Sequence, residues 1–380
     1  MIKRIKEDNL IFAFMINIMA LISSLIFFRP FFEENDDAFI AMIAEGAFGK
    51  RDFHVIYPNA LYGKLLSLLS ALFPALRWHS IIQYILVFGA LTAISFLIFE
   101  YSKKRGLGIL FILASFYELY VSLQYSKTAL AASTAGFALI LDEVLRAFDK
   151  GRRLDLKRLI PASLLLFFGA LLRDSSFFLA GIFALSALLT GAFSRLLKRE
   201  GRERMGLLTV NCLKAFLPII LLVFACIFYN KGLYDSDSEW KSFISYNKSR
   251  MELLDYRYDL MDFNGNEKLL REEGISENDA LLYLTWQFGD DKVIPKEKMS
   301  GLVKKGEKRP FDISLLKAFA FNIYKDIFNI TPLLVFTLML IVLSFAEGFR
   351  RGKGGRLLLF ETALFLCIYF MLLFYFQYSG

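Results

Sequence analysis

The residues with the clearest potential for chemistry are four carboxylates within the segment 33–37, which reads EENDD. Like charges this close repel one another, so the cluster is costly to maintain. One interpretation is structural: Asp36 and Asp37 would be solvated caps at the positive end of a helix over 38–48. The other is functional: one carboxylate would act as a general base toward a hydroxyl group, or as a metal ligand.

The residues that bind zinc or form disulfides are scarce in this chain. It has two histidines, His54 and His79, and its three cysteines lie within apolar runs without paired spacing. We therefore expect neither a zinc site nor a disulfide framework. A divalent cation at the acidic segment stays compatible with the sequence, although no second carboxylate cluster completes a coordination shell.

Charged residues in or beside apolar runs form a further group of candidates. Glu118 lies within an apolar run and needs a cationic partner such as Lys127. Arg173 and Asp174 meet at the junction of two apolar runs, where the pair is either a helix-end anchor or part of a site. An arginine there could hold a phosphate group bidentately, whereas a lysine supplies a point charge.

The elements that must position these residues are apolar helices. Hydrophobic residues make up 56% of the chain, its mean hydropathy is +0.47, and it contains 41 Phe but only 3 Trp. Such an excess requires an apolar solvent. We predict an all-α polytopic membrane protein with about nine transmembrane helices. The runs that carry this prediction are 10–28, 79–101, 106–122, 127–147, 158–173, 175–195, 205–229, 329–347 and 355–377.

The net charge of +8 does not indicate a nucleic-acid partner, because the basic residues gather at the ends of apolar runs. The first run ends in RPFF at 29–32 rather than in small residues, so we expect an uncleaved anchor with a cytoplasmic N-terminus. The apolar stretch 59–76 is predicted to lie in the outer interface, because four basic loops then fall on the cytoplasmic side. Those loops are 103–105, 146–158, 195–204 and 350–356.

Three regions follow from this topology. Residues 1–229 are predicted to form a membrane domain whose first outer loop is 30–78. Residues 230–328 are predicted to form an extracytoplasmic segment, and residues 329–380 a C-terminal pair of transmembrane helices. Within the second region, the aromatic content of 230–312 predicts a small folded unit. Residues 313–328 are predicted to form an amphipathic helix that leads back to the membrane.

Local signals in the extracytoplasmic segment are of two kinds. Ser276 is expected to cap a helix with Asp279 at its third position. Arg250 is either surface charge on the small unit or a contact to a phosphate group or to the acidic loop.

The first 105 residues resemble the opening of GT-C glycosyltransferases. The features in common are the acidic pair after the first span, a helix ending at Gly46, and the segment YPNALYGK at 57–64 that leads into an interfacial helix. The resemblance is closest to the aminoarabinose transferase and protein mannosyltransferase branch, and to uncharacterised membrane proteins of Gram-positive bacteria. The chain departs from that pattern in having fewer spans, and in having Asp where some branches have Glu as the second acidic residue.

The resemblance implies a multi-pass cell-membrane enzyme that moves a sugar from a polyprenyl-phosphate donor to an extracytoplasmic acceptor. Asp36 or Asp37 would be the base that deprotonates the acceptor. The phosphate of the donor would be bound by cations at the outer interface, and further residues would line the same cavity. The candidate cations are Lys64, Lys127, Arg173 and Arg250, and the lining residues are His54, Tyr57, Glu118 and Asp174.

Two other functions fit a chain of this kind. A polysaccharide polymerase of the cell envelope would place its essential arginine in the late outer segment, at a position such as Arg250. A transporter or flippase for a lipid-linked substrate would need charged or broken helices near the membrane midplane, and the sequence contains few.

Overall fold

The computed structural model describes most of the chain, which forms two compact units. The first consists of 1–230 and 330–366, and the second of 231–329 and 367–380. The first boundary lies next to the predicted one at 229, whereas the predicted third region is divided between the two units. The amphipathic helix expected at 313–328 lies outside the described residues except for Lys317. The described residues are 8–102, 105–196, 204–287, 294–306, 317, 331–350 and 355–379.

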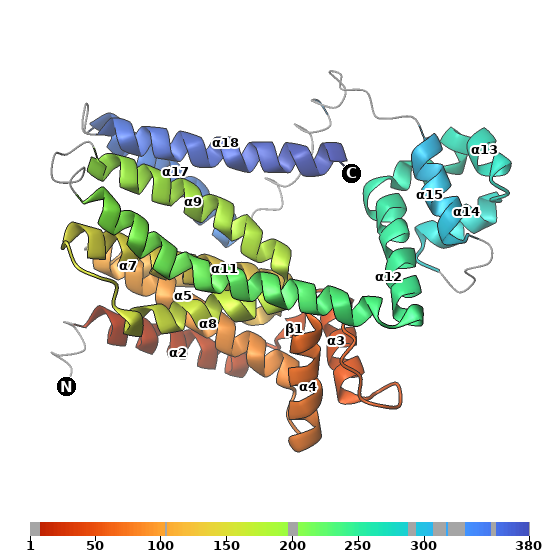
Figure 1. The fold of residues 1–380 in the computed structure, drawn as a ribbon, viewed down its shortest axis with the longest axis horizontal. Coiled ribbons are helices and arrows are strands. Elements are labelled where there is room, and N and C mark those ends of the chain that lie inside the picture. The colour runs from red at the N-terminus through yellow and green to blue at the C-terminus, as the bar shows by residue number, and fades with distance from the viewer. Residues whose placement is uncertain are drawn as a thin grey trace. The chain divides into compact units, whose positions relative to one another are not determined.

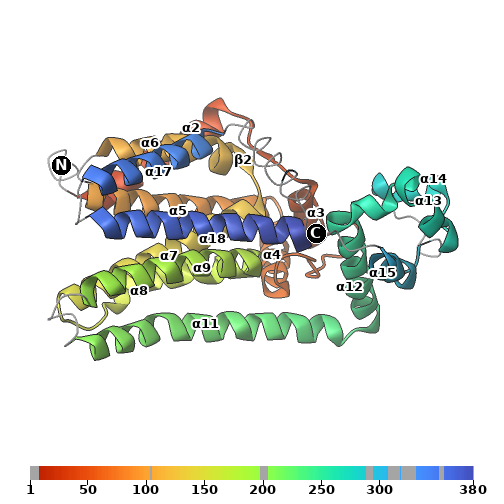
Figure 2. The ribbon, with the colours of Figure 1, turned by 90° about the horizontal axis from the view of Figure 1, so that it is seen from above.

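The first unit is built from long apolar helices that lie side by side (Figures 1 and 2). In the described part of the chain, six helices are long and apolar enough to cross a membrane. This confirms a multi-pass helical membrane protein. The six are α2 (Asn9–Phe27), α5 (Trp78–Ser102), α7 (Tyr125–Asp149), α9 (Asp174–Leu196), α11 (Met205–Asp235) and α17 (Pro332–Arg350).

The other three predicted spans are helical as well. Helix α6 (Arg105–Phe116) is 12 residues long and continues into a π-helical turn, η1 (Tyr117–Val121). Helix α8 (Leu156–Leu172) has 17 residues and α18 (Arg356–Ser379) has 24. These three are not among the six identified in the described part of the chain, so a ninefold crossing stays a prediction.

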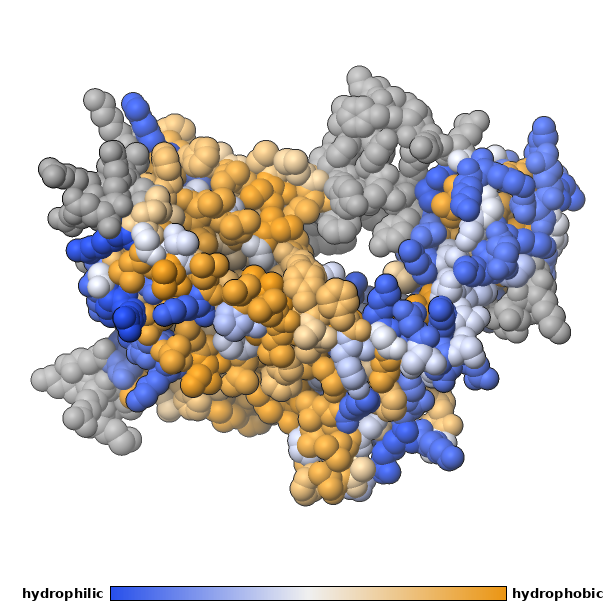
Figure 3. Space-filling view, viewed as in Figure 1, coloured by the Kyte–Doolittle hydropathy of each residue, from blue (hydrophilic) through white to orange (hydrophobic). Residues whose placement is uncertain are grey.

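The surface of the first unit reflects this composition. Apolar residues cover most of the helical face seen in Figure 3, and hydrophilic residues gather toward the ends of the helices. Many large apolar side chains of this unit are exposed, such as Leu164, Ile160 and Leu221. A soluble protein rarely exposes so much contiguous apolar surface, whereas lipid-facing helices require it.

The first outer loop contains two short helices. Helix α3 (Asn35–Glu45) carries both aspartates in its first turn and ends at Gly46, whose φ of 84° is the left-handed conformation that terminates many helices. Helix α4 (Ala60–Leu72) begins at Asn59, whose side chain accepts the Leu61 N–H. With 13 residues, α4 is about 20 Å long, too short for a hydrocarbon core of about 30 Å. Its length therefore agrees with the interfacial interpretation.

A two-residue parallel ladder, which the sequence did not indicate, fixes the start of this loop. Strand β1 (Phe31–Phe32) pairs with β2 (Ser122–Leu123), which immediately precedes α7. The Glu33 N–H then donates to the Leu123 carbonyl at 2.9 Å. These bonds bring the acidic segment to the first turn of α7.

Helices α7 and α8 pack closely because small residues line their contact. A Cβ added at Gly136 would lie 2.8 Å from the Ala162 carbonyl oxygen, and one at Gly169 would lie 3.0 Å from the Ala129 carbonyl oxygen. Small residues allow the backbones of membrane helices to approach in this way. The contact places the C-terminal end of α8 next to the N-terminal end of α7.

The second unit has a helical core of its own. Leu253, Met261, Leu270 and Leu302 are fully buried in it. Its elements are α12 (Ser238–Met251), η2 (Glu252–Tyr256), η3 (Tyr258–Met261), α13 (Phe263–Glu272), α14 (Glu277–Leu284) and α15 (Lys296–Lys305).

The predicted helix cap in the second unit is present. The Ser276 side chain accepts the Asp279 backbone N–H, and the Asp279 carboxylate accepts the Ser276 backbone N–H. This reciprocal pair is a capping box, which satisfies donors at the start of α14.

Candidate functional site

Asp37 is buried at the centre of a polar network in the first unit. Its side chain is 0% exposed, and one carboxylate oxygen accepts three hydrogen bonds. The donors are His79 Nε2 at 2.9 Å, Gln83 Nε2 at 2.8 Å and the Tyr125 backbone N–H at 3.0 Å. His79 and Gln83 are four residues apart on α5 and therefore share a face of that helix. The three donors offset the cost of burying the carboxylate.

The same network reaches α4 and the body of α7. The Tyr62 hydroxyl lies 2.9 Å from His79 Nδ1, and the Thr128 hydroxyl donates to Gln83 Oε1 at 3.0 Å. If His79 donates from Nε2 to Asp37, its Nδ1 accepts from Tyr62 and every member of the network is satisfied. Burial raises the pKa of the Tyr62 hydroxyl well above its usual range, and the charge of Asp37 acts in the same direction.

This network determines what Asp37 can do. It ties α3, α4, α5 and α7 together, and its carboxylate has no surface through which a substrate could approach. Asp37 is therefore a positioning residue that holds the start of α3. Its partners Tyr62, His79, Gln83 and Thr128 were not predicted from the sequence. A histidine and a glutamine four residues apart in an apolar run were the signal that could have revealed them.

Asp36 has different surroundings. Its side chain is partly exposed, and its charge acts on the phenol of Tyr125. Arg173 Nη1 donates to the Tyr125 hydroxyl at 3.0 Å and to Ser126 Oγ at 2.5 Å. The ring of Tyr57 stacks on that of Tyr125, with centroids 6.3 Å apart. The structure thus gathers three predicted residues, Asp36, Tyr57 and Arg173, around Tyr125.

Lys127 belongs to an ion-pair cluster next to this group. It pairs with Glu118 at 2.6 Å, which confirms the predicted partner, and it also pairs with Glu33. Ser122 Oγ donates to Glu33 at 3.0 Å. Two carboxylates already surround the single charge of Lys127, so it has little attraction left for a phosphate group.

Lys64 lies elsewhere in the first outer loop. Its ammonium group donates to the Tyr229 hydroxyl at 2.5 Å and lies 4.8 Å from the centre of the Phe53 ring. Within the described parts of the chain, no carboxylate lies within ion-pairing distance of it. The aromatic contacts hold the charge without neutralising it, so Lys64 retains its attraction for an anion.

His54 pairs with Asp52 in the same loop. Asp52 Oδ1 lies 2.6 Å from His54 Nδ1 and accepts the His54 backbone N–H at 3.0 Å. Burial of Asp52 opposes its ionisation, but these hydrogen bonds outweigh burial and lower the pKa of its carboxyl group. The ring of His54 packs on Phe53, with centroids 4.1 Å apart. The pair stabilises the connection between α3 and α4.

The remaining candidates have local roles. Asp174 starts α9, where its carboxylate accepts the Ser175 N–H at 2.7 Å. Arg250 belongs to the second unit and is 5% exposed. Its guanidinium donates to Asn247 at 2.9 Å, pairs with Asp255 at 3.4 Å and lies 4.7 Å from the centre of the Trp286 ring. These contacts stabilise the small unit itself.

No cluster of three or more His, Cys, Asp or Glu side chains that could hold a metal ion occurs among the residues that the structure describes. The fold and this site define a multi-pass helical membrane protein with a polar group at one end of its helices. No protein-family model, curated protein or solved structure matches the chain.

Proposed function

We propose that the protein is a GT-C-type glycosyltransferase of the cell membrane, which moves a sugar from a polyprenyl-phosphate donor to an extracytoplasmic acceptor. The observation that carries the proposal is that Tyr125 brings the two groups into one neighbourhood: Arg173 donates to its hydroxyl, and the charge of Asp36 acts on the same phenol. A carboxylate that can take a proton and a guanidinium that can hold a phosphate then belong to one site. Their position at the end of an apolar bundle suits a substrate whose carrier is a lipid.

The chemistry assigned to these residues is a displacement at the anomeric carbon of the sugar. Asp36 removes the proton of the acceptor hydroxyl as its oxygen bonds to that carbon, and the bond from the carbon to the phosphate oxygen breaks. The polyprenyl phosphate leaves with the electron pair of that bond. Arg173 stabilises the negative charge of the leaving phosphate.

Asp37 supports this chemistry without touching the substrate. Its three hydrogen bonds fix the first turn of α3, and Asp36 precedes it in that turn. Adjacent helical residues point about 100° apart, so Asp36 does not share the buried direction of Asp37 and stays partly exposed. Of the two aspartates that the sequence could not distinguish, we assign the base to Asp36.

We also infer nine crossings with a cytoplasmic N-terminus. This topology is supported by the ends of the described helices. The helix ends that adjoin the basic segments 103–105, 146–158, 195–204 and 350–356 lie at one end of the first unit (Figure 2). The acidic loop and Arg173 lie at the opposite end, which is then extracytoplasmic.

The test is a transfer assay with the full chain in liposomes, using a panel of radiolabelled polyprenyl-phosphate hexoses and counting label released from the lipid. Asp36→Asn is expected to lower turnover by about 100-fold or more, the usual contribution of a general base. Glu34→Gln changes an exposed neighbouring carboxylate and should leave turnover within about twofold. Unchanged transfer by Asp36→Asn would rule out the proposed role.

A polysaccharide polymerase would require a different arrangement of the extracytoplasmic segment 230–328. It needs an arginine that can reach a substrate, but Arg250 is buried against Asn247, Asp255 and Trp286. This environment favours the glycosyltransferase proposal over the polymerase. Arg250→Ala should accordingly unfold the small unit rather than remove activity selectively.

A further inference from the structure

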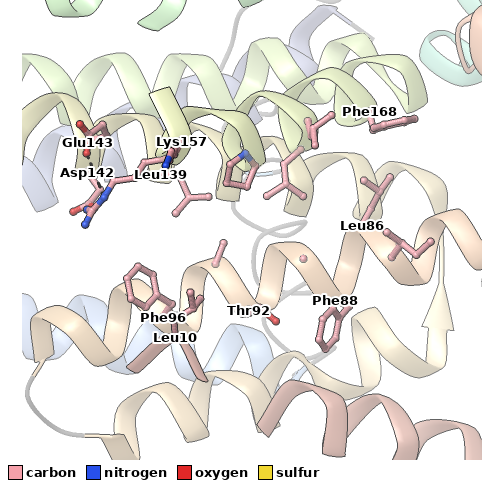
Figure 4. A pocket seen from close by; sticks show the side chains of 17 residues that line it. Leu10, Leu86, Phe88, Thr92, Phe96, Leu139, Asp142, Glu143, Lys157 and Phe168 are labelled. Carbon is pink, nitrogen blue, oxygen red and sulfur yellow. Dashed lines mark ion pairs between the residues drawn. The ribbon is translucent and has the colours of Figure 1, made fainter. Parts of the chain in front are cut away.

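A groove whose charged end lies at the opposite end of the first unit from Asp36 plays no part in the proposed chemistry. It has a volume of 610 Å³ and lies between α2, α5, α7 and α8 (Figure 4). Its walls are almost entirely apolar along most of its length. Representative lining residues are Leu10, Leu86, Phe96, Leu139, Leu164 and Phe168.

The dimensions of the groove match one lipid chain. On α8 it runs from Lys157 to Phe168, and on α5 from Phe96 back to Ile85. Each stretch has twelve residues and spans about 16 Å, close to half of a hydrocarbon core of about 30 Å. A water-sized group takes up about 30 Å³, so the volume admits about twenty heavy atoms, as in a single acyl chain. The groove is therefore as deep as one membrane leaflet.

Charged residues stand where the apolar walls end. Lys157 and Arg158 line that end together with Asp142 and Glu143 (Figure 4). Both carboxylates are already bound: Asp142 pairs with Arg146 at 2.7 Å, and Glu143 pairs with Arg152 at 2.7 Å. Arg158 is half exposed and makes only long contacts, 3.8 Å each, with Glu143 and Asp155. Lys157 has an exposed side chain and, among the described residues, no carboxylate within ion-pairing distance.

A second, polar cavity of 430 Å³ adjoins the groove and shares Phe96 and Arg158 with it. Its lining includes Asp8, Glu100 and Arg146, so carboxylates and a guanidinium group face the same space. Asp8 Oδ1 caps α2, and Glu100 pairs with Arg146 at 3.5 Å, so each carboxylate would accept the ammonium group in addition to its present partner. Such a mixed lining gives little net attraction to a purely anionic group. It complements a headgroup that carries a phosphate and an ammonium group together.

We propose that the groove and the adjoining cavity hold one phosphatidylethanolamine molecule from the leaflet at the N-terminal end of α8. One acyl chain lies in the groove, the phosphate accepts hydrogen bonds from Lys157 and Arg158, and the primary ammonium group donates to Glu100 and Asp8. A choline headgroup has no N–H to donate, and a glycerol headgroup has no cation. The site is independent of the proposed transferase activity.

The test is lipid retention by the full chain. The protein is incorporated into nanodiscs of equal parts phosphatidylethanolamine, phosphatidylglycerol and phosphatidylcholine, released in mild detergent and examined by native mass spectrometry. The wild-type chain should retain about one phosphatidylethanolamine, about tenfold over the other two lipids, as one charge-assisted hydrogen bond would give. Lys157→Gln should lower this retention by a similar factor.

Two substitutions on α8 separate the groove from the general lipid-facing surface. Leu164 lines the groove and is 52% exposed, whereas Ile160 is 60% exposed and does not line it. Leu164→Trp should abolish retention, and Ile160→Trp should preserve it. Leu10→Trp, which fills the groove from α2, provides a second blocking variant should Leu164→Trp fail to fold.

Several results would overturn the proposal. Equal retention by the blocking variants and by Ile160→Trp would show that the groove is not the binding site. Equal retention of phosphatidylcholine, a preference for phosphatidylglycerol, or a co-purified polyprenyl phosphate in its place would show that the headgroup assignment is wrong.

Discussion

At the scale of single residues, the main result is that two adjacent aspartates have opposite environments. Asp37 is fully buried with three hydrogen-bond donors, and Asp36 is partly exposed beside Tyr125. The two side chains are chemically identical, so only their positions on α3 determine which one can act as a base. Because Asp37 is buried, we expect its replacement to lower the stability of the fold rather than to remove a group that touches the substrate.

The stability of the Asp37 network provides a prediction. Asp37→Ala leaves His79, Gln83 and the Tyr125 N–H without their acceptor, and each buried donor left unsatisfied costs about 1–3 kcal/mol. The midpoint of thermal unfolding in detergent should fall markedly. Asp36→Ala, the matched change one position away, should shift it little. Equal midpoints for the two variants would mean that the network contributes nothing to stability.

At the scale of elements, the contact between α7 and α8 determines where Arg173 meets Tyr125. Arg173 follows the last residue of α8, and Tyr125 begins α7. The close approach at Gly136 and Gly169 brings these two helix ends together. A shift of α8 along α7 would separate the guanidinium from the phenol even if both helices stayed intact.

Two glycine substitutions test this contact. Gly136→Ala puts a Cβ 2.8 Å from the Ala162 carbonyl oxygen, so the helices must separate and unfolding should require less free energy, by about 1–3 kcal/mol. Gly106→Ala meets nothing within 4 Å and should be neutral or stabilising, because Ala favours a helix by about 1 kcal/mol. Unfolding in the presence of increasing sodium dodecyl sulfate measures both. A loss of stability in Gly106→Ala as large as that in Gly136→Ala would argue against a packing effect.

At the scale of the whole molecule, the status of α4 determines which side of the membrane each loop occupies. If α4 crossed, every later loop would change sides. Its 13 residues and the common location of the basic helix ends agree with an interfacial α4.

Cysteine labelling on intact cells tests this topology. Ala75 lies between α4 and α5, Lys150 lies after α7, and both are exposed. A membrane-impermeant maleimide should label Ala75→Cys on intact cells, and Lys150→Cys only after the membrane is permeabilised. The unsubstituted chain, whose own cysteines lie in apolar helices, measures background labelling. Labelling of Lys150→Cys on intact cells would invert the proposed orientation.

The sequence by itself determined the class of the protein and the sites of its helices. Long apolar runs have no alternative to helix in a membrane, because every backbone polar group must be paired within the segment. Three further features could also be inferred from local patterns: the short α4, the glycine that ends α3 and the pairing of Glu118 with Lys127. These features depend on neighbours in the chain or on the solvent alone.

Only the tertiary structure determined the roles of the candidate site residues. The sequence did not reveal that Asp37 would meet His79 and Gln83, that Lys127 would be held by two carboxylates, or that Arg250 would be buried in a separate unit. Each of these outcomes depends on contacts between helices that are distant in the chain. Hydropathy and charge specify which segments enter the membrane, but the packing of side chains between segments specifies which polar groups meet.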